Sequence, residues 1–340
     1  MNGGACMRII GFLLKTVLVL VVLGAGALFA IWFFNPFAPK IAMGDPLPTG
    51  RRVTDNGMVA NYFPGTGAGK RPGILFLGGS EGGLSPGVTR MAKDLQSRGY
   101  AVLHVSYFGA PGQAPLLSLI PLETFDRALD WLKAQPEVDG ERLAVVGGSK
   151  GAEAALIVAA RHPELRAVAA GMPSNVAWQG IDFNLLNFMI NPPGGSWTLN
   201  GRPIPFVAYT QDFRGGDIVD LYRMSLEQAT NLKDAVIRIE LTRAPILLVC
   251  GKQDTLWPSC LMADRVKERA VQMGGPEVTV LAYENAGHAV FGIPLDKTNK
   301  NYDVLDSLGG TDDGNNAARA DGWAKIVAHL DARLKQDQKP

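Results

Sequence analysis

Largely apolar runs recur along the chain from residue 73 onward, and they do not alternate polar with apolar positions. The runs are GILFL (73–77), AVLHVS (101–106), LAVV (143–146), RAVAA (166–170), PILLVC (245–250) and EVTVLAY (277–283). Unbroken runs of about four to eight residues that are rich in Val, Ile and Leu are typical of strands buried on both faces of a sheet. The pattern therefore predicts a series of buried strands.

Helix-like stretches lie between most of these runs. They cover residues 86–98, 121–135, 150–161 and 259–273, with a last one at 321–335. Strands that alternate with helices predict an α/β fold, with a mostly parallel sheet and helices on both of its faces. The interval 172–244 breaks this rhythm and is far longer than an ordinary connection, so we expect a cap insertion there.

The N-terminal segment has a different pattern. Residues 9–34 are apolar apart from Lys15, and the part from Thr16 onward approaches the roughly 20 residues that a bilayer-spanning helix needs. We expect residues 1–34 to contain an uncleaved single-pass anchor, with residues 9–34 in the membrane. The alternative is a cleaved signal peptide, for which Ala25-Gly26-Ala27 offers a cleavage site of small residues.

The charges around this segment predict its orientation. Arg8 and Lys15 precede the uninterrupted apolar part, and the aromatic residues 32–34 lie at its far end, where an interfacial belt would lie. The positive-inside rule then places the N-terminus in the cytoplasm and the folded domain outside it, which is the periplasm in a bacterium. Basic residues beyond the span oppose this orientation, and they are Lys40, Arg51 and Arg52.

Composition sets the bounds of the folded domain and argues against some classes of partner and site. Residues 35–50 hold four prolines and are predicted to be a linker, which leaves 51–340 as the folded domain. The net charge of +1 and the lack of a Lys/Arg block argue against nucleic acid as a partner. Three cysteines, Cys6, Cys250 and Cys260, show no metal-binding spacing and leave at least one unpaired, so we expect neither a disulfide scaffold nor a metal site.

Two copies of Gly-x-Ser-x-Gly, around Ser80 and Ser149, each follow an apolar run. This pattern is the sequence form of the nucleophile elbow, a sharp turn between a strand and a helix that exposes a serine hydroxyl. Ser149 is followed by KGAEAALIVAARH, which is rich in the helix former alanine, whereas Ser80 is followed by EGGLSPG, which cannot hold a helix. Ser149 is therefore the predicted nucleophile.

The stretch around Ser80 has a second possible role. Hydrolases with an elbow place a Gly-rich loop after a central strand, where its backbone N–H groups bind the oxyanion together with the N–H that follows the nucleophile. We expect these donors to be the backbone N–H groups of Ser80, Glu81 and Lys150. The alternative is a plain flexible loop.

A serine nucleophile needs a histidine base that is held by a carboxylate. His104 lies within a predicted strand, His162 at the end of a helix and His329 in the terminal helix. Only His288 falls on a loop directly after the last apolar run, and Asp254 follows the strand before it. The order Ser, Asp, His matches that of elbow hydrolases, so these three residues form the predicted triad.

With these residues in place, the chain resembles the catalytic C-terminal domain of the acyl-CoA thioester hydrolase and bile acid-CoA:amino acid N-acyltransferase family, near the dienelactone hydrolases. The resemblance runs from about Pro72 to the C-terminus. Its matching stretches are GGSKGAE (147–153), APILLVCGKQDTLWPS (244–259), AGHAV (286–290) and AARADGWAKIVAHL (317–330).

The resemblance implies an α/β-hydrolase fold with Ser149, Asp254 and His288 as the triad. It also implies hydrolysis, because the acyltransferase members of this family use a cysteine nucleophile where this chain has a serine. Animal members carry an immunoglobulin-like domain ahead of the catalytic one, and residues 51–71 are too few to hold it. A predicted membrane segment stands in its place. With the predicted orientation the domain would face a compartment outside the cytoplasm, where coenzyme A thioesters are scarce.

The sequence thus predicts a serine hydrolase that cleaves a small-molecule acyl thioester or ester through an acyl-enzyme, without a cofactor. Apolar residues of the insertion either cover the acyl chain or pack in the core, and they are Phe183, Leu185, Leu186, Phe188 and Met189. Two alternatives remain. One is a carboxylesterase or dienelactone-type hydrolase of small esters, and the other is a non-catalytic, membrane-tethered binding protein, which would be expected to lack a triad residue.

Overall fold

The computed structural model of this chain describes residues 3–36, 38 and 40–335. The side chains of residues 3–6 and of Leu185 lie outside the described part. The expectations made above for Cys6 and for the Leu185 side chain therefore concern residues that are not described. The chain divides into two units. One comprises Met1–Pro39 and Ile181–Pro193, and the other comprises Lys40–Gly180 and Gly194–Pro340.

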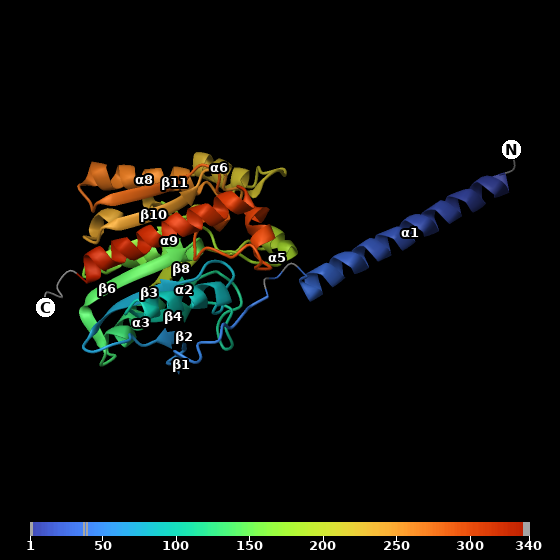
Figure 1. The fold of residues 1–340 in the computed structure, drawn as a ribbon. Coiled ribbons are helices and arrows are strands. Elements are labelled where there is room, and N and C mark those ends of the chain that lie inside the picture. The colour runs from blue at the N-terminus through green and yellow to red at the C-terminus, as the bar shows by residue number, and fades with distance from the viewer. Residues whose placement is uncertain (1–2, 37, 39, 336–340) are drawn as a thin grey trace. The chain divides into compact units, whose positions relative to one another are not determined.

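An eight-stranded sheet forms the centre of the larger unit, in the order β1-β2-β4-β3-β6-β7-β10-β11 (Figure 1). The strands are β1 (Arg51–Asp55), β2 (Met58–Phe63), β3 (Arg71–Leu77), β4 (Ala101–Ser106), β6 (Val138–Gly148), β7 (Ala167–Gly171), β10 (Ile246–Gly251) and β11 (Val278–Tyr283). The β1–β2 and β2–β4 pairs are antiparallel, and all the others are parallel. The six predicted strands are therefore present, and the β1–β2 hairpin is an addition to them.

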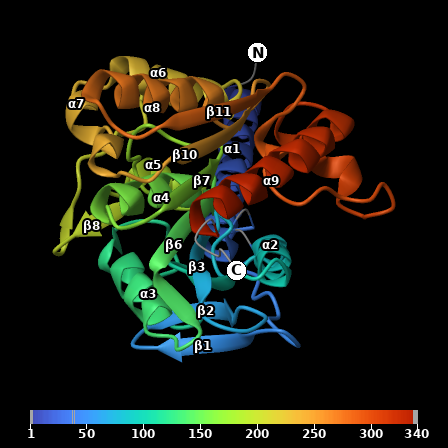
Figure 2. The ribbon, with the colours of Figure 1, turned by 60° about the vertical axis from the view of Figure 1, so that its left-hand side comes forward.

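Five helices cover the sheet, with α2 and α9 on one face and α3, α4 and α8 on the other (Figure 2). They are α2 (Pro86–Ser97), α3 (Glu123–Lys133), α4 (Lys150–Arg161), α8 (Ser259–Met273) and α9 (Asp312–Leu334). The last helix begins at Asp312, well before the predicted start at 321. The Thr311 side chain caps it by accepting a hydrogen bond from the Gly314 N–H at 3.0 Å, which offsets the weak helix propensity of the first turns.

The interval 172–244 is tied into the larger unit at several points. It contains α5 (Leu185–Ile190), β8 (Trp197–Leu199), β9 (Arg202–Pro203), α6 (Ile218–Gln228), α7 (Leu232–Ala235) and the 3-10 turn Ile239–Leu241. Strand β8 pairs with β9 and, in parallel, with β5 (Ile120–Pro121). Trp178 and Trp197 are fully buried near the start of this interval and Ile239 near its end, so both parts of the interval contribute to the core.

The apolar residues proposed to cover an acyl chain are not part of that core. Phe183, Leu186 and Phe188 are half-buried, and Met189 is exposed. They belong to Ile181–Pro193, the segment that groups with the N-terminal helix. These described side chains therefore do not pack in the core, which was one of the two roles left open above.

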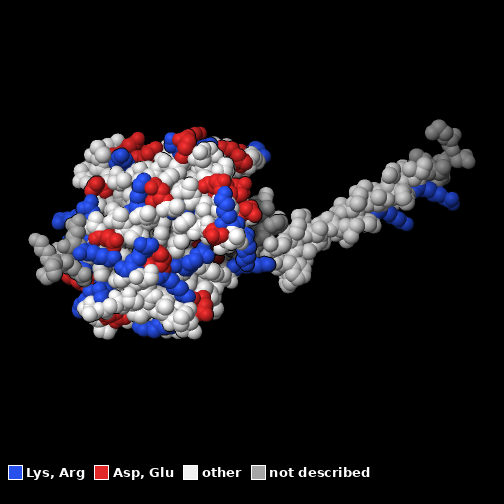
Figure 3. All heavy atoms as spheres, viewed as in Figure 1, with Lys and Arg blue, Asp and Glu red and all other residues white. Residues whose placement is uncertain are grey.

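Helix α1 (Gly3–Phe34) dominates the smaller unit. Within the described residues it is the one helix long and apolar enough to cross a membrane, over Met7–Phe34 with a mean hydropathy of 2.7, and a signal sequence would have the same character. Figure 3 shows mixed positive and negative side chains over the larger unit, whereas α1 carries charge only toward its N-terminal end. The Trp32 indole N–H donates to Asn187 Oδ1 at 2.7 Å, and the Asn184 amide donates to the Trp32 carbonyl at 2.7 Å.

Part of the predicted linker belongs to the larger unit. The Gly44 N–H donates to the Leu84 carbonyl at 2.6 Å, and the Leu84 N–H donates to the Ala42 carbonyl at 2.9 Å. Met43 packs on the buried cluster of Val59, Leu84 and Ala110. Residues 42–44 therefore form a short bridge with the loop that follows β3.

Candidate active site

Ser149 stands between the last residue of β6 and the first residue of α4. Its φ of 55° and ψ of −124° place a non-glycine residue in a strained turn, which is the backbone form of an elbow. Glycines permit this crowding, because a Cβ on Gly147 would lie 2.1 Å from the Gly151 carbonyl oxygen and one on Gly151 would lie 2.2 Å from that of Gly78. The serine hydroxyl is consequently presented at the carboxyl edge of the sheet.

The structure brings the three predicted triad residues together. His288 Nε2 lies 3.0 Å from Ser149 Oγ, and His288 Nδ1 lies 2.9 Å from Asp254 Oδ2. His288 and Asp254 are only 7% and 6% exposed, whereas Ser149 is half-buried and accessible. In this order a histidine can take the serine proton while the carboxylate holds the ring and stabilises its charged form.

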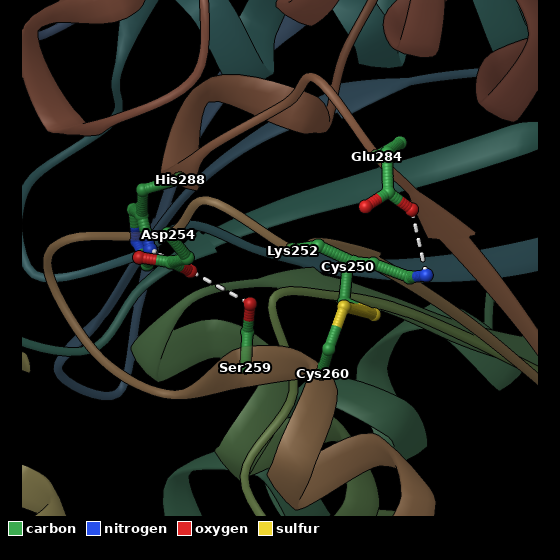
Figure 4. Close-up of a disulfide and its surroundings, with 7 residues drawn as sticks. All are labelled: Cys250, Lys252, Asp254, Ser259, Cys260, Glu284 and His288. Atoms are coloured by element: carbon green, nitrogen blue, oxygen red, sulfur yellow. Dashed lines mark hydrogen bonds and ion pairs between the residues drawn. A yellow bond between two sulfur atoms is a disulfide. The ribbon is translucent and has the colours of Figure 1, made fainter.

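Asp254 is held by three donors besides His288. The backbone N–H groups of Leu256 and Trp257 donate to its Oδ1 at 3.0 and 3.2 Å, and the Ser259 hydroxyl donates to its Oδ2 at 2.7 Å. Figure 4 shows the Ser259 hydroxyl pointing at this carboxylate from the first turn of α8. These bonds fix the orientation of the acid relative to the imidazole.

A disulfide between Cys250 and Cys260 closes the loop that carries Asp254 (Figure 4). Cys250 lies in β10 and Cys260 in the first turn of α8, with 5.1 Å between their Cα atoms. The sequence analysis did not assign this bond, because three cysteines leave at least one unpaired and no disulfide scaffold was expected. The available signal was their placement on the two sides of one strand-to-helix loop.

The loop with His288 is fixed by the early part of α9. Fully buried Asn315 accepts the Gly287 N–H at 2.9 Å through Oδ1. Its Nδ2 group donates to the carbonyl groups of Leu305, Gly309 and Thr311 at 2.9 to 3.0 Å. The sequence analysis did not identify Asn315 because it began this helix at 321.

The loop around Ser80 lies against the nucleophile. A Cβ on Gly79 would lie 3.1 Å from the Ser149 Cβ, so glycine is needed at this approach. The Tyr107 hydroxyl lies 2.6 Å from the Gly78 carbonyl oxygen and 3.1 Å from that of Gly79. The loop is therefore both close to Ser149 and held from behind.

Glu81 brings a carboxylate to this loop. Burial of the carboxyl group raises its pKa, while hydrogen bonds from the backbone of Glu81 and Gly79, the charge of His288 and the Ser85 hydroxyl act in the opposite direction. The net pKa is raised, although the residue as a whole keeps exposed surface. In this structure the Glu81 carboxylate thus occupies N–H groups of the loop that was predicted to bind an oxyanion.

The other histidines lie apart from the triad. His104 is buried in β4, His162 pairs with Asp126 and Glu164 at the end of α4, and His329 lies in α9. Across residues 3–36, 38 and 40–335, no cluster of three or more His, Cys, Asp or Glu side chains has the arrangement of a metal site.

The α/β-hydrolase class is defined by a mostly parallel sheet with helices on both faces, together with an elbow serine, an acid and a histidine on loops after its strands. Here the acid follows β10 and the histidine follows β11. Solved structures of that class confirm the fold. A putative dienelactone hydrolase from Klebsiella pneumoniae aligns with a TM-score of 0.52 and 17% identity over 83% of this chain and 96% of its own. The acylaminoacyl peptidase of Pyrococcus horikoshii aligns with a TM-score of 0.54 and 14% identity. That alignment covers 86% of this chain and 43% of the peptidase chain.

The chain belongs to the family described as BAAT / Acyl-CoA thioester hydrolase C terminal, which matches residues 120–336. It is 26% identical to acyl-coenzyme A thioesterase 5 of Mus musculus over 85% of this chain, and 26% identical to bile acid-CoA:amino acid N-acyltransferase of the same species over 90%. These matches cover 66% and 68% of the two mouse proteins, and the remainder of each lies outside the match. The resemblance drawn from the sequence is thereby confirmed.

Proposed function

We propose that this protein is a serine hydrolase that cleaves acyl thioesters through an acyl-enzyme, with carboxylic esters as a secondary substrate class. The observation that carries the proposal is the pair of hydrogen bonds that links Ser149 to His288 and His288 to Asp254, at 3.0 and 2.9 Å. Family membership and the thioesterase relatives support a thioester as the substrate.

The reaction begins with proton transfer from Ser149 Oγ to His288 Nε2 as the oxygen attacks the acyl carbon. The tetrahedral oxyanion is bound by backbone N–H groups, for which Ser80, Glu81 and Lys150 are the proposed donors. The C–S bond then breaks, and the thiol leaves with the proton from His288. Water attacks the acyl carbon and gives a proton to His288. His288 then returns this proton to Ser149 Oγ as the ester C–O bond breaks, which releases the carboxylic acid and restores the free Ser149 hydroxyl.

The Glu81 carboxylate must leave the loop before an oxyanion binds. In the resting structure it accepts the N–H groups of Glu81 and Gly79, and a developing negative charge beside it would be repelled. The N–H groups of Ser80 and Lys150 are the proposed primary donors, and that of Glu81 joins them when its carboxylate moves out.

We also propose that α1 anchors the protein in a membrane with the larger unit outside the cytoplasm. The apolar span Met7–Phe34, the positions of Arg8 and Lys15 before most of it, and the Cys250–Cys260 disulfide support this arrangement. The substrate would then be an acyl thioester or ester available in an oxidising compartment.

Two measurements on the full chain test these proposals. The first compares turnover of acyl-CoA thioesters and short aryl esters, with Ser149→Ala as the control and a fluorophosphonate probe to label the nucleophile. Ser149-dependent thioester turnover supports the proposal, turnover of aryl esters alone identifies a carboxylesterase, and an unlabelled Ser149 identifies a binding protein. The second measurement is membrane fractionation, where a shortened chain in the soluble extracytoplasmic fraction would show that α1 is a signal peptide.

A further inference from the structure

A buried ion pair lies directly behind the proposed nucleophile. Lys150, the residue after Ser149, is 2% exposed, and its Nζ lies 2.5 Å from Glu153 Oε2, whose side chain is fully buried. The Ser196 hydroxyl is a second partner of the ammonium group at 2.9 Å. Because the loss of hydration offsets much of the attraction within a buried pair, such a pair is weak evidence of a role in stability alone.

Glu153 connects this pair to two tryptophans in the N-terminal part of the insertion. Its Oε1 accepts the Trp178 N–H at 3.0 Å and the Trp197 indole N–H at 2.6 Å. All three carboxylate contacts are made by buried residues, Lys150, Trp178 and Trp197. The first turn of α4, which sets the direction of the Lys150 backbone N–H, is thus bound through one carboxylate to Trp178 and Trp197.

Trp197 also supports the loop on the other side of the nucleophile. Its ring packs against Tyr107 with 5.7 Å between ring centroids and against Phe125 with 5.8 Å, and the Lys150 ammonium lies 5.4 Å from its ring centroid. Tyr107 in turn holds the carbonyl groups of Gly78 and Gly79. In a trans peptide the N–H points opposite to the C=O, so the N–H groups of Gly79 and Ser80 are turned away from Tyr107.

We propose that Tyr107 and the Lys150–Glu153 pair are positioning residues that hold the two halves of the oxyanion hole on one support, Trp197. Tyr107 orients the loop donors, and the ion pair orients the Lys150 N–H at the start of α4. This inference rests on the proposed acyl-enzyme function. It assigns a role to the Lys and Glu of the SKGAE stretch that the triad leaves unexplained.

The loop half is tested with Tyr107→Phe, which removes one oxygen and keeps the ring that packs on Trp197. We expect kcat for an acyl thioester to fall about tenfold to a hundredfold with KM nearly unchanged, because the donors act on the transition state. Affinity for a trifluoromethyl ketone that forms a tetrahedral adduct should fall by a similar factor. Tyr100→Phe is the matched control, since it removes another buried hydroxyl, which bonds Asp331 away from the site.

The helix half is tested with the double variant Lys150→Met, Glu153→Gln. It removes both charges, while the Gln carbonyl oxygen can still accept the N–H groups of Trp178 and Trp197. We expect a folded protein whose kcat falls about tenfold or more with KM retained. In both variants the carbonyl stretch of the acyl-enzyme should move to higher frequency, which reports weaker hydrogen bonds to the acyl oxygen and does not respond to a loss of stability.

The outcomes separate this inference from the proposed function. If the wild-type chain turns over no acyl substrate and Ser149 is not labelled, the proposed function fails and the inference falls with it. If the wild type is active but both variants keep its kcat, inhibitor affinity and carbonyl frequency, the function stands and the positioning role is wrong. A fall in melting temperature without these changes would likewise overturn it.

Discussion

His288 Nε2 lies 3.0 Å from Ser149 Oγ, although 139 residues separate the two in the chain. The sheet explains this meeting. Ser149 follows β6, Asp254 follows β10 and His288 follows β11, and these strands lie within the run β6-β7-β10-β11. Because parallel strands end at one edge of the sheet, their following loops meet there.

Ser149 and Ser80 should respond differently to replacement by alanine. Ser149→Ala removes the covalent step, so we expect a loss of activity that approaches about 10⁶-fold and no trapped acyl-enzyme. Ser80→Ala keeps the backbone N–H that is proposed to bind the oxyanion, so the loss should be about tenfold or less. Burst kinetics and mass-spectrometric acylation with an activated ester measure both. Acylation retained in Ser149→Ala and abolished in Ser80→Ala would reverse the assignment of the elbow.

Asp254→Asn should preserve the fold and nearly abolish turnover. The amide would favour the wrong His288 tautomer, and a triad loses about four orders of magnitude in kcat through that change. Steady-state kinetics and a melting curve of the same preparation provide the check. Ser259→Ala is a useful companion, because it removes one hydrogen bond to Asp254 and keeps the carboxylate, so its effect should be much smaller. Wild-type activity in Asp254→Asn would remove Asp254 from the triad.

The Cys250–Cys260 disulfide should support both stability and activity. Replacing both cysteines by alanine removes a short cross-link, for which the expected loss in the free energy of unfolding is about 2 to 3 kcal/mol. We expect kcat to fall as well, because the bond closes the loop that holds Asp254. Urea unfolding and kinetics on the full chain in detergent measure the two effects, with Cys6→Ala as the control. Unchanged kcat would show that the hydrogen bonds to Asp254 suffice without the bond.

His104 should make the folded state sensitive to acid. Burial lowers its pKa to about 3, with a smaller contribution from the charge of Arg52. Below pH 6.5 His104 is protonated in the unfolded chain but stays neutral in the folded chain. Its contribution to the free energy of unfolding is therefore fully present above pH 6.5 and is lost as the pH falls toward 3.

His104→Asn should remove this pH dependence while keeping a polar group near Thr89, whose hydroxyl lies 3.3 Å from His104 Nδ1. Between pH 7.5 and 5 we expect the wild type to lose about 2 kcal/mol more unfolding free energy than the variant. Urea unfolding at several pH values is the measurement. Parallel curves for the two proteins would show that His104 is protonated in the folded state at pH 5.

The strands of the sheet and the helices on it were predictable because runs of consecutive apolar residues indicate buried elements. ILFL in β3 and ILLVC in β10 have no polar face, and the alanine-rich stretch after Ser149 has no helix breaker after Gly151. The elbow and the loop positions of Asp254 and His288 followed from the same local pattern. Local sequence therefore placed the triad candidates on the correct elements.

The missed features depend on contacts between distant segments. Asn315 matters because it reaches the Gly287 N–H, and Tyr107 because it reaches two glycine carbonyl groups behind the nucleophile. Neither contact leaves a periodic signal near the residue that makes it. Glu153 is similar, since the spacing to Lys150 indicates only a surface pair on a helix, and burial of that pair depends on the tryptophans of the insertion.

The grouping of Ile181–Pro193 with α1 affects how the protein can be prepared without α1. Asn184 and Asn187 bond to Trp32 near the end of α1, and Met189 and Ile190 are 70% and 82% exposed. Cutting the chain after α1 would remove the Trp32 partner of the two asparagines and leave these exposed apolar side chains as a site for aggregation. A truncated protein suited to crystallisation would therefore need polar replacements at 189 and 190 in addition to the cut.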